Sequence, residues 1–219
     1  MKTLYDCFRD YVAVKTLAGE HGYQTGEFGL QDARAAVAFR ALPPVLCLQL
    51  KRYEYDTQRD TIVRVRITSR MGYLSGSNLT PKIDDHFEFP SEVDLNEFLD
   101  EAADRTEPWR YRLHSVLVHS GDTHGGHNYA LIKSDLYTRW LKFDDDQVTP
   151  ATDREVPERS YGGGPLGVVP QTQRDWPMAM KKYTNANVLV YIREAAIGEV
   201  MAPVTEEDTP PHLSKLIFG

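Results

Sequence analysis

Residues 111–146 are YRLHSVLVHSGDTHGGHNYALIKSDLYTRWLKFDDD, and the strand pattern of this stretch decides the fold. Three of its segments, Tyr111–His119, Tyr129–Lys133 and Trp140–Phe143, are bounded by turn residues and have the alternation typical of β-strands. A fourth strand is predicted at Val188–Ile192. The links within the stretch are too short for helical crossovers, so we expect mostly antiparallel pairing. The sequence therefore predicts a sheet that is mainly antiparallel.

The same stretch contains a candidate catalytic pair. His127 follows Gly125-Gly126 at the start of a strand, where a backbone without side chains lets a substrate chain approach an imidazole. Asp144 lies one strand later, so a hairpin could bring its carboxylate to His127, where it would fix the tautomer of a general base for a thiol. Asp145 alternates with Asp144, and either could be the orienting carboxylate. An ordinary glycine hairpin and a solvated acidic turn are the alternative interpretations.

Histidines in this region do not form a convincing metal site. Four of them lie close together in the sequence: His114, His119, His124 and His127. His114 and His119 have an odd separation on one strand and should face opposite ways, and the nearest carboxylate, Asp122, is in a tight turn. The glycine-rich run 162–167 matches neither a P-loop nor a dinucleotide motif. We expect no metal and no cofactor.

The chain has only two cysteines, Cys7 and Cys47, which excludes a disulfide framework and a zinc site made of cysteines. Cys7 lies in an apolar segment around Leu4–Val12 that predicts a short helix. Cys47 lies in the middle of a predicted strand. Neither has the exposed setting at a helix start that lowers a thiol pKa, so we expect both to be structural and partly buried.

Composition and charge restrict the class of protein. The chain has 219 residues, 41% of them hydrophobic, which is ample for a packed core. A net charge of −7 disfavours unspecific attraction to nucleic acid or to an anionic membrane. No apolar run approaches the roughly 18 residues that span a bilayer, and the first residues contain no apolar signal core. We expect an intracellular protein.

Other elements are predicted from local patterns. Helices are expected at Gln31–Arg40, ended by the prolines that follow, and near Leu95–Ala103, with Asp94 as a cap. A strand is expected from Val45 through Tyr55, with alternate leucines on one face. Residues 64–81 have turn chemistry and are interpreted as a mobile insertion, and the residues from about 198 onward as a linker or tail.

Several motifs, taken together and in order, carry a resemblance. They are Tyr11–Val14, Leu17–Gly19, Gly29–Ala33, Leu42–Tyr53 (LPPVLCLQLKRY), Phe87–Pro90, Leu117–Gly121, Gly125–His127, Phe143–Asp146 and Asn185–Tyr191. With these motifs the chain resembles the C-terminal half of a ubiquitin-specific protease catalytic domain, nearest to the herpesvirus-associated subgroup and its fungal relatives. The match covers roughly residues 4–60 and 83–195. One departure is Asn128, where the family usually has tyrosine.

The resemblance implies an α+β fold, a partial papain-like cysteine protease with mainly the antiparallel palm sheet, a few helices and no thumb. Residues 1–197 would be the C-terminal part of the catalytic domain, with 198–219 a linker or tail. The implied activity is that of a deubiquitinase, which hydrolyses the isopeptide bond after the C-terminal glycine of ubiquitin. His127 would match the general base, Asp144 the orienting carboxylate and Asp145 a second contributor.

The resemblance also implies binding partners and a missing part. The family's nucleophilic cysteine region is absent, so the chain alone is expected to be inactive, and a catalytically inactive ubiquitin-binding module is the alternative. The expected partners are ubiquitin and ubiquitinated proteins, without nucleic acid or membrane, in the nucleus and cytoplasm. The residues expected to touch ubiquitin are Arg52, Tyr53, Tyr55, His119, Asp122 and His124.

Overall fold

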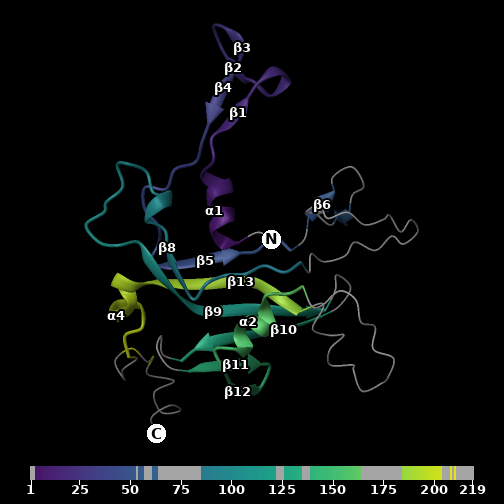
Figure 1. Ribbon diagram of the computed structural model, residues 1–219, viewed down its shortest axis with the longest axis vertical. Coiled ribbons are helices and arrows are strands. Elements are labelled where there is room, and N and C mark those ends of the chain that lie inside the picture. The colour runs from purple at the N-terminus through teal and green to yellow at the C-terminus, as the bar shows by residue number, and fades with distance from the viewer. Residues whose placement is uncertain are drawn as a thin grey trace.

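The structure is a computed structural model that describes residues 3–52, 54–56, 61–63, 85–121, 126–134, 139–163, 184–203, 208 and 210. Its main feature is one seven-stranded sheet (Figure 1). The strands are β5 (Val45–Gln49), β8 (Glu92–Asp94), β9 (Arg110–Gly121), β10 (Gly126–Lys133), β11 (Trp140–Asp144), β12 (Gln147–Ala151) and β13 (Thr184–Arg193). Their order is β12-β11-β10-β9-β13-β5, with β8 paired to β9, and every strand pair in this sheet is antiparallel. The four predicted strands and their antiparallel pairing are confirmed.

The hydrophobic core is built around the three central strands, β9, β10 and β13. Their largest fully buried apolar side chains are Tyr111, Val116, Val118, Leu131, Leu189 and Tyr191. The two tyrosine hydroxyls donate to backbone carbonyls, at 2.9 Å to Pro43 and at 2.7 Å to Pro90, so neither buried hydroxyl lacks a partner. Burial raises the pKa of Tyr111 to about 12, which keeps that phenol neutral. The central strands therefore form a stable base for the residues at their ends.

Helix α1 (Leu4–Val12) confirms the helix predicted near the N-terminus. It begins with a capping box, in which the Thr3 hydroxyl accepts from the Asp6 amide at 3.2 Å and the Asp6 carboxylate accepts from the Thr3 amide at 2.9 Å. The helix buries Leu4 and Phe8, and the ring of Phe8 stacks on Phe98 with 5.2 Å between centroids. These contacts attach the start of the chain to the core.

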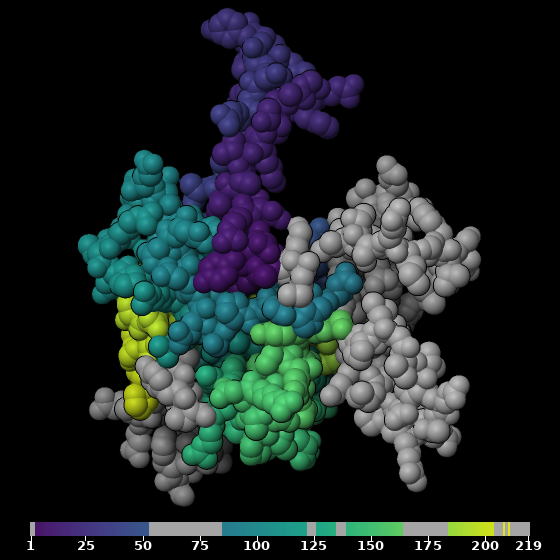
Figure 2. Space-filling view, in the orientation of Figure 1, coloured from purple at the N-terminus to yellow at the C-terminus, as the bar shows by residue number. Residues whose placement is uncertain are grey.

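The predicted helix at Gln31–Arg40 is wrong. Its first residues belong to two small two-stranded sheets, β1 (Lys15–Leu17) with β4 (Ala33–Ala35) and β2 (Tyr23–Thr25) with β3 (Gly29–Gln31), and the 3-10 turn η1 (Gly19–His21) lies between β1 and β2. Figure 2 shows this purple segment standing clear of the rest of the described chain. Pairing with a strand distant in sequence overrides the local helix preference of the alanines.

The second predicted helix, at Leu95–Ala103, is also wrong, because only the 3-10 turn η2 (Asn96–Phe98) forms there. The Leu95 amide donates to the Trp109 carbonyl at 2.9 Å and the Asp100 amide to the Phe39 carbonyl at 2.8 Å. In a continuous helix the Asp100 amide would donate to the Asn96 carbonyl, and its bond to Phe39 takes the place of that helical bond. Asp94 does not cap a helix; its carboxylate instead accepts from the Asn96 amide in a local turn.

The strand predicted from Val45 through Tyr55 is shorter than expected. β5 ends at Gln49, and Tyr55 lies in a separate strand, β6 (Glu54–Asp56), which pairs with β7 (Thr61–Val63). Within β5, Leu46 is buried and its neighbours Val45 and Cys47 are exposed, so the predicted alternation is correct there. The predicted insertion at residues 64–81 lies outside the described residues.

Several elements have no counterpart in the sequence prediction. They include β8, β12, helix α2 (Glu155–Ser160), the 3-10 turn η4 (Glu194–Ala196) and helix α4 (Ile197–Val200). Helix α4 crosses the predicted boundary between residues 197 and 198, and the division into domain and tail stays a prediction. Among the described residues, no helix has both the length and the apolar character that crossing a membrane requires.

Candidate active site

The candidate site lies where β10 begins and β11 ends. His127 is the second residue of β10, and Asp144 is the last residue of β11. In the register of this antiparallel pair, Leu131 is opposite Lys142 and Ala130 is opposite Phe143. Side chains alternate along a strand, so His127 and Tyr129 share one face of the hairpin with Lys142 and Asp144. His127 and Asp144 are diagonal neighbours on that face, which is within reach of long side chains.

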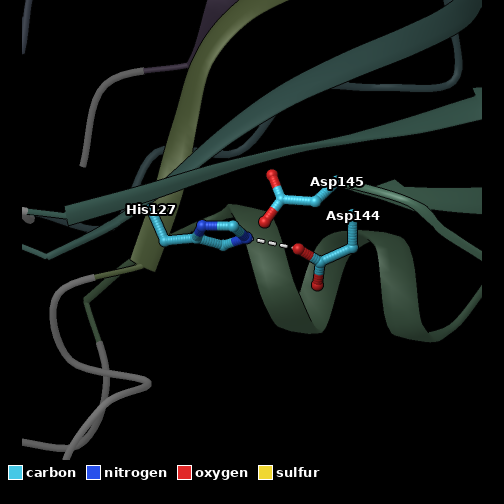
Figure 3. Close-up of side chains that lie close together, drawn as sticks. All are labelled: His127, Asp144 and Asp145. Carbon is cyan, nitrogen blue, oxygen red and sulfur yellow. Dashed lines mark hydrogen bonds and ion pairs between the residues drawn. The ribbon is translucent and has the colours of Figure 1, made fainter.

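The imidazole and the carboxylate are in contact. His127 Nε2 donates to Asp144 Oδ1, as the dashed line in Figure 3 shows. A carboxylate can only accept, so this bond places the proton of the neutral ring on Nε2 and leaves the lone pair on Nδ1. The His127 side chain is 48% exposed, and that of Asp144 is 26% exposed. The site therefore presents a basic nitrogen of fixed tautomer at the surface.

Charges around the pair support this arrangement. The hydrogen bond that His127 donates to Asp144 is the largest cause that raises the pKa of His127, and the negative charges of Asp144 and Asp145 add to it. Partial burial and the charge of Lys142 oppose the rise. The pKa of Asp144 is lowered, first by its hydrogen bond with Lys142 and then by that with His127. Asp144 therefore stays ionised while His127 can take up a proton.

Asp145 lies in the turn between β11 and β12, where one of its carboxylate oxygens comes within 4.8 Å of a ring nitrogen of His127. Its φ of +52° is in the left-handed region, which aspartate tolerates better than most residues. Figure 3 shows its carboxylate beside that of Asp144 on the same side of the ring. Of the two carboxylates that the sequence left open, the structure brings Asp144 to His127. The catalytic roles of these residues stay predictions.

His127, Asp144 and Asp145 each offer one ligand atom within 4.8 Å of the others, which is a spacing that a metal ion could use. The second oxygen of Asp144, however, contacts the Lys142 ammonium, and that positive charge would oppose a cation. We assign no metal to these residues. Proton transfer is the chemistry that suits them.

Comparison with known proteins identifies the family. The family described as "Ubiquitin carboxyl-terminal hydrolase" matches residues 6–191. The chain belongs to the ubiquitin carboxyl-terminal hydrolase family. Its relatives include ubiquitin carboxyl-terminal hydrolase 15 of Schizosaccharomyces pombe, 45% identical over 213 residues, and ubiquitin C-terminal hydrolase 12 of Arabidopsis thaliana, 42% identical over 220 residues.

These matches cover 97% of this chain in both cases, but only 17% and 18% of the two relatives. The chain thus spans about a sixth of the length of the hydrolases it matches. A solved structure of the yeast SAGA DUBm contains a similar chain, with a TM-score of 0.56 and 26% sequence identity, covering 88% of this chain and 33% of that one. The mainly antiparallel sheet with few helices is consistent with a papain-like fold of this hydrolase family.

A glycine at the start of β10 sets the distance between β10 and the neighbouring strand β9, next to the candidate base. A Cβ atom on Gly126 would lie 2.3 Å from Nε2 of His119 and 2.7 Å from the carbonyl oxygen of Ser120. Both residues belong to β9, which pairs with β10 so that Ser120 faces His127. Only glycine fits at position 126. The close approach of β9 and β10 that it allows places His127, the next residue, opposite Ser120.

The residues predicted to bind ubiquitin are placed very differently from one another. Arg52 is only 5% exposed, and its guanidinium donates to the carbonyls of Ala186 at 2.9 Å and Asp85 at 3.1 Å. These contacts favour a structural role for Arg52. His119 is partly buried against Gly126. Of the remaining four, Tyr53, Asp122 and His124 lie outside the described residues, and Tyr55 is described only as part of the backbone of β6.

The expectation that both cysteines are partly buried is wrong, since Cys7 and Cys47 are both exposed. Cys47 points away from the face of β5 that buries Leu46. It is also far from the candidate base, because β5 and β10 are three places apart in the sheet, or about 14 Å at the usual strand spacing. Cys7 is on α1, which Figure 1 draws at the β5 side of the sheet. Neither thiol of the chain is placed beside His127.

Sequence reasoning missed Lys142 and Tyr129. Lys142 contacts Asp144, and its Nζ lies 4.4 Å from the centroid of the Tyr129 ring. The available signal was the period of two, which puts Lys142 on the same face as Asp144. Lysines at strand surfaces are common, so this signal alone does not distinguish a contact with the site from an exposed side chain.

Proposed function

We propose that this chain is the C-terminal part of the catalytic domain of a ubiquitin-specific cysteine protease, of the herpesvirus-associated subgroup. It would act in the hydrolysis of the isopeptide bond after the C-terminal glycine of ubiquitin. The observation that carries the proposal is the contact between His127 and Asp144 across β10 and β11, in a chain that belongs to the ubiquitin carboxyl-terminal hydrolase family. Ubiquitin and ubiquitinated proteins would be the partners, in the nucleus and cytoplasm.

The proposed chemistry uses the two ring nitrogens for different tasks. Nδ1 of His127 takes the proton of a cysteine thiol, and the thiolate attacks the carbonyl carbon of the ubiquitin C-terminal glycine. The imidazolium then gives this proton to the leaving lysine amine, and a water molecule releases ubiquitin from the acyl-enzyme. Asp144 accepts from Nε2 throughout, so it holds the ring in place and stabilises its positive charge.

We propose that the nucleophilic cysteine belongs to another part of a longer polypeptide. The exposed positions of Cys7 and Cys47, away from His127, support this, as does the small share of the relatives that the chain spans. On this proposal, the chain alone does not hydrolyse ubiquitin conjugates. The same observations favour the second candidate, a catalytically inactive module that binds ubiquitin.

Two measurements separate these candidates. The first mixes the chain with the segment that precedes the matched region in the Schizosaccharomyces pombe relative and follows cleavage of ubiquitin carrying a C-terminal fluorophore. We expect turnover by the mixture and none by the chain alone. The second titrates the chain with labelled ubiquitin. Saturable binding together with an inactive mixture would refute the protease proposal and favour the binding module.

A further inference from the structure

Lys142 is the one described cation in contact with the candidate dyad. It lies two residues before Asp144 on β11, and its side chain is only 21% exposed. Its Nζ contacts Oδ2 of Asp144, while Oδ1 of the same carboxylate contacts His127. Each oxygen of Asp144 therefore has its own donor, one from the neighbouring strand and one from the same strand.

The ammonium of Lys142 is itself held from a second direction. It lies 4.4 Å from the centroid of the Tyr129 ring, which is within range of a cation–π interaction. Tyr129 is on β10, two residues after His127, so the ring and the imidazole project from the same face. Burial raises the pKa of Tyr129 to about 12, so the phenol stays neutral. Tyr129, Lys142 and Asp144 thus form a chain of contacts that ends at His127.

We propose that Lys142 is a positioning residue that holds the Asp144 carboxylate in the orientation that accepts the Nε2 proton of His127. Asp144 is the last residue of its strand, next to the two-residue turn 145–146, and its partner His127 is 48% exposed. A carboxylate anchored only by that imidazole would turn toward water for part of the time. The ammonium removes this freedom, because rotating the carboxylate would break a second charged hydrogen bond. The catalytic consequence of this inference rests on the proposed function.

Lys142 could act by positioning Asp144 or only by its charge, and removing it would change the pKa of His127 in opposite directions in the two cases. The positive charge of Lys142 by itself lowers the pKa of His127, so its removal would raise that pKa. The hydrogen bond that His127 donates to Asp144 raises the pKa of His127 and is the larger cause. If Lys142 holds Asp144 in place, its removal weakens this bond and the pKa of His127 falls. The charged groups that act on His127 are Asp144, Asp145 and Lys142.

The experiment measures the His127 titration by NMR in the full chain and compares Lys142→Met, Lys142→Arg and Asp144→Asn with the unmodified protein. In Lys142→Met we expect the His127 pKa to move down toward its value in Asp144→Asn, with the neutral ring no longer restricted to the Nε2–H tautomer. Lys142→Arg keeps a positive charge and N–H groups that can donate to the Asp144 carboxylate, so it should retain the direction of the original behaviour. The matched control is Lys133→Met, because Lys133 Nζ lies over the Trp140 ring at 5.2 Å on the neighbouring strand and should leave His127 unchanged.

A His127 pKa that rises or stays the same in folded Lys142→Met would overturn the inference. The same holds if Lys142→Arg behaves like Lys142→Met. If Lys142→Met does not fold, Lys142→Gln replaces it, with the same expected direction. The titration needs no nucleophile, so it can fail or succeed independently of ubiquitin cleavage. An inactive mixture of the two domain parts would contradict the proposed function and leave the positioning of Asp144 to be decided by NMR.

Discussion

Replacing Gly126 with alanine should disturb the start of β10 and separate His127 from Asp144. The new Cβ would lie 2.7 Å from the Ser120 carbonyl oxygen, where ordinary contacts begin at 3.4 Å, so the strand must move by about 0.7 Å. It would also lie 2.3 Å from the His119 ring, which can rotate, whereas the carbonyl belongs to the backbone of β9. We expect a loss of about 1–3 kcal/mol in the free energy of unfolding, the usual cost of overpacking.

The assay is urea unfolding of the full chain, together with the NMR titration of His127. Gly198→Ala is the matched control, because a Cβ there meets nothing within 4 Å in helix α4, and the change should be neutral or stabilising by about 0.4–1 kcal/mol. The double variant His119→Ala with Gly126→Ala removes the contact with the ring and should recover only part of the loss. If Gly126→Ala were as stable as Gly198→Ala, with an unchanged His127 titration, the steric argument would be wrong.

Three further changes test the site and the core. Asp144→Asn should lower the pKa of His127, as measured by NMR. A His127 pKa that is raised in the folded state stabilises the fold below the ordinary histidine pKa, and this stabilisation is lost as pH rises through the raised value. In Asp144→Asn this contribution to the free energy of unfolding should be smaller, as measured by urea unfolding across pH. Leu131→Ala should cost about 2–5 kcal/mol in the same unfolding assay, because Leu131 is fully buried in β10; a loss below 1 kcal/mol would contradict this position for it. Thr3→Ala should cost about 0.5–2 kcal/mol and raise the pKa of Asp6 from its lowered value, because the capping box is lost; an unchanged Asp6 titration would count against the cap.

The sheet could be predicted from the sequence, and the helices largely could not. Strands β9, β10 and β11 have short links and alternating side chains, and both features are local. The segments at Gln31–Arg40 and Leu95–Ala103 have helical patterns, but their backbone amides bond to partners far away in the sequence. No local pattern contains that information. The two cysteines were misjudged for a related reason, since an apolar neighbourhood in sequence does not say which face of an element is covered.

The candidate site was predictable as far as its residue types and spacing allowed. The glycines before His127 and the hairpin length pointed to a pairing with Asp144 or Asp145. The choice between them depends on the three-dimensional shape of the turn, where both carboxylates come near the imidazole but Asp144 is the one that forms the hydrogen bond with His127. Lys142 was not predicted as part of the site, because its position there depends on a contact with the Tyr129 ring, which lies on the neighbouring strand.

The most direct test of the central claim compares two histidine variants in the reconstituted domain. His127→Ala removes the candidate base, and His86→Ala removes another histidine that has a carboxylate partner, Glu88 at 3.0 Å. Turnover of the fluorogenic ubiquitin substrate should fall by about 10²–10⁴-fold in His127→Ala and change little in His86→Ala. Equal turnover by the two variants, at the rate of the unmodified domain, would contradict the assignment of His127 as the base.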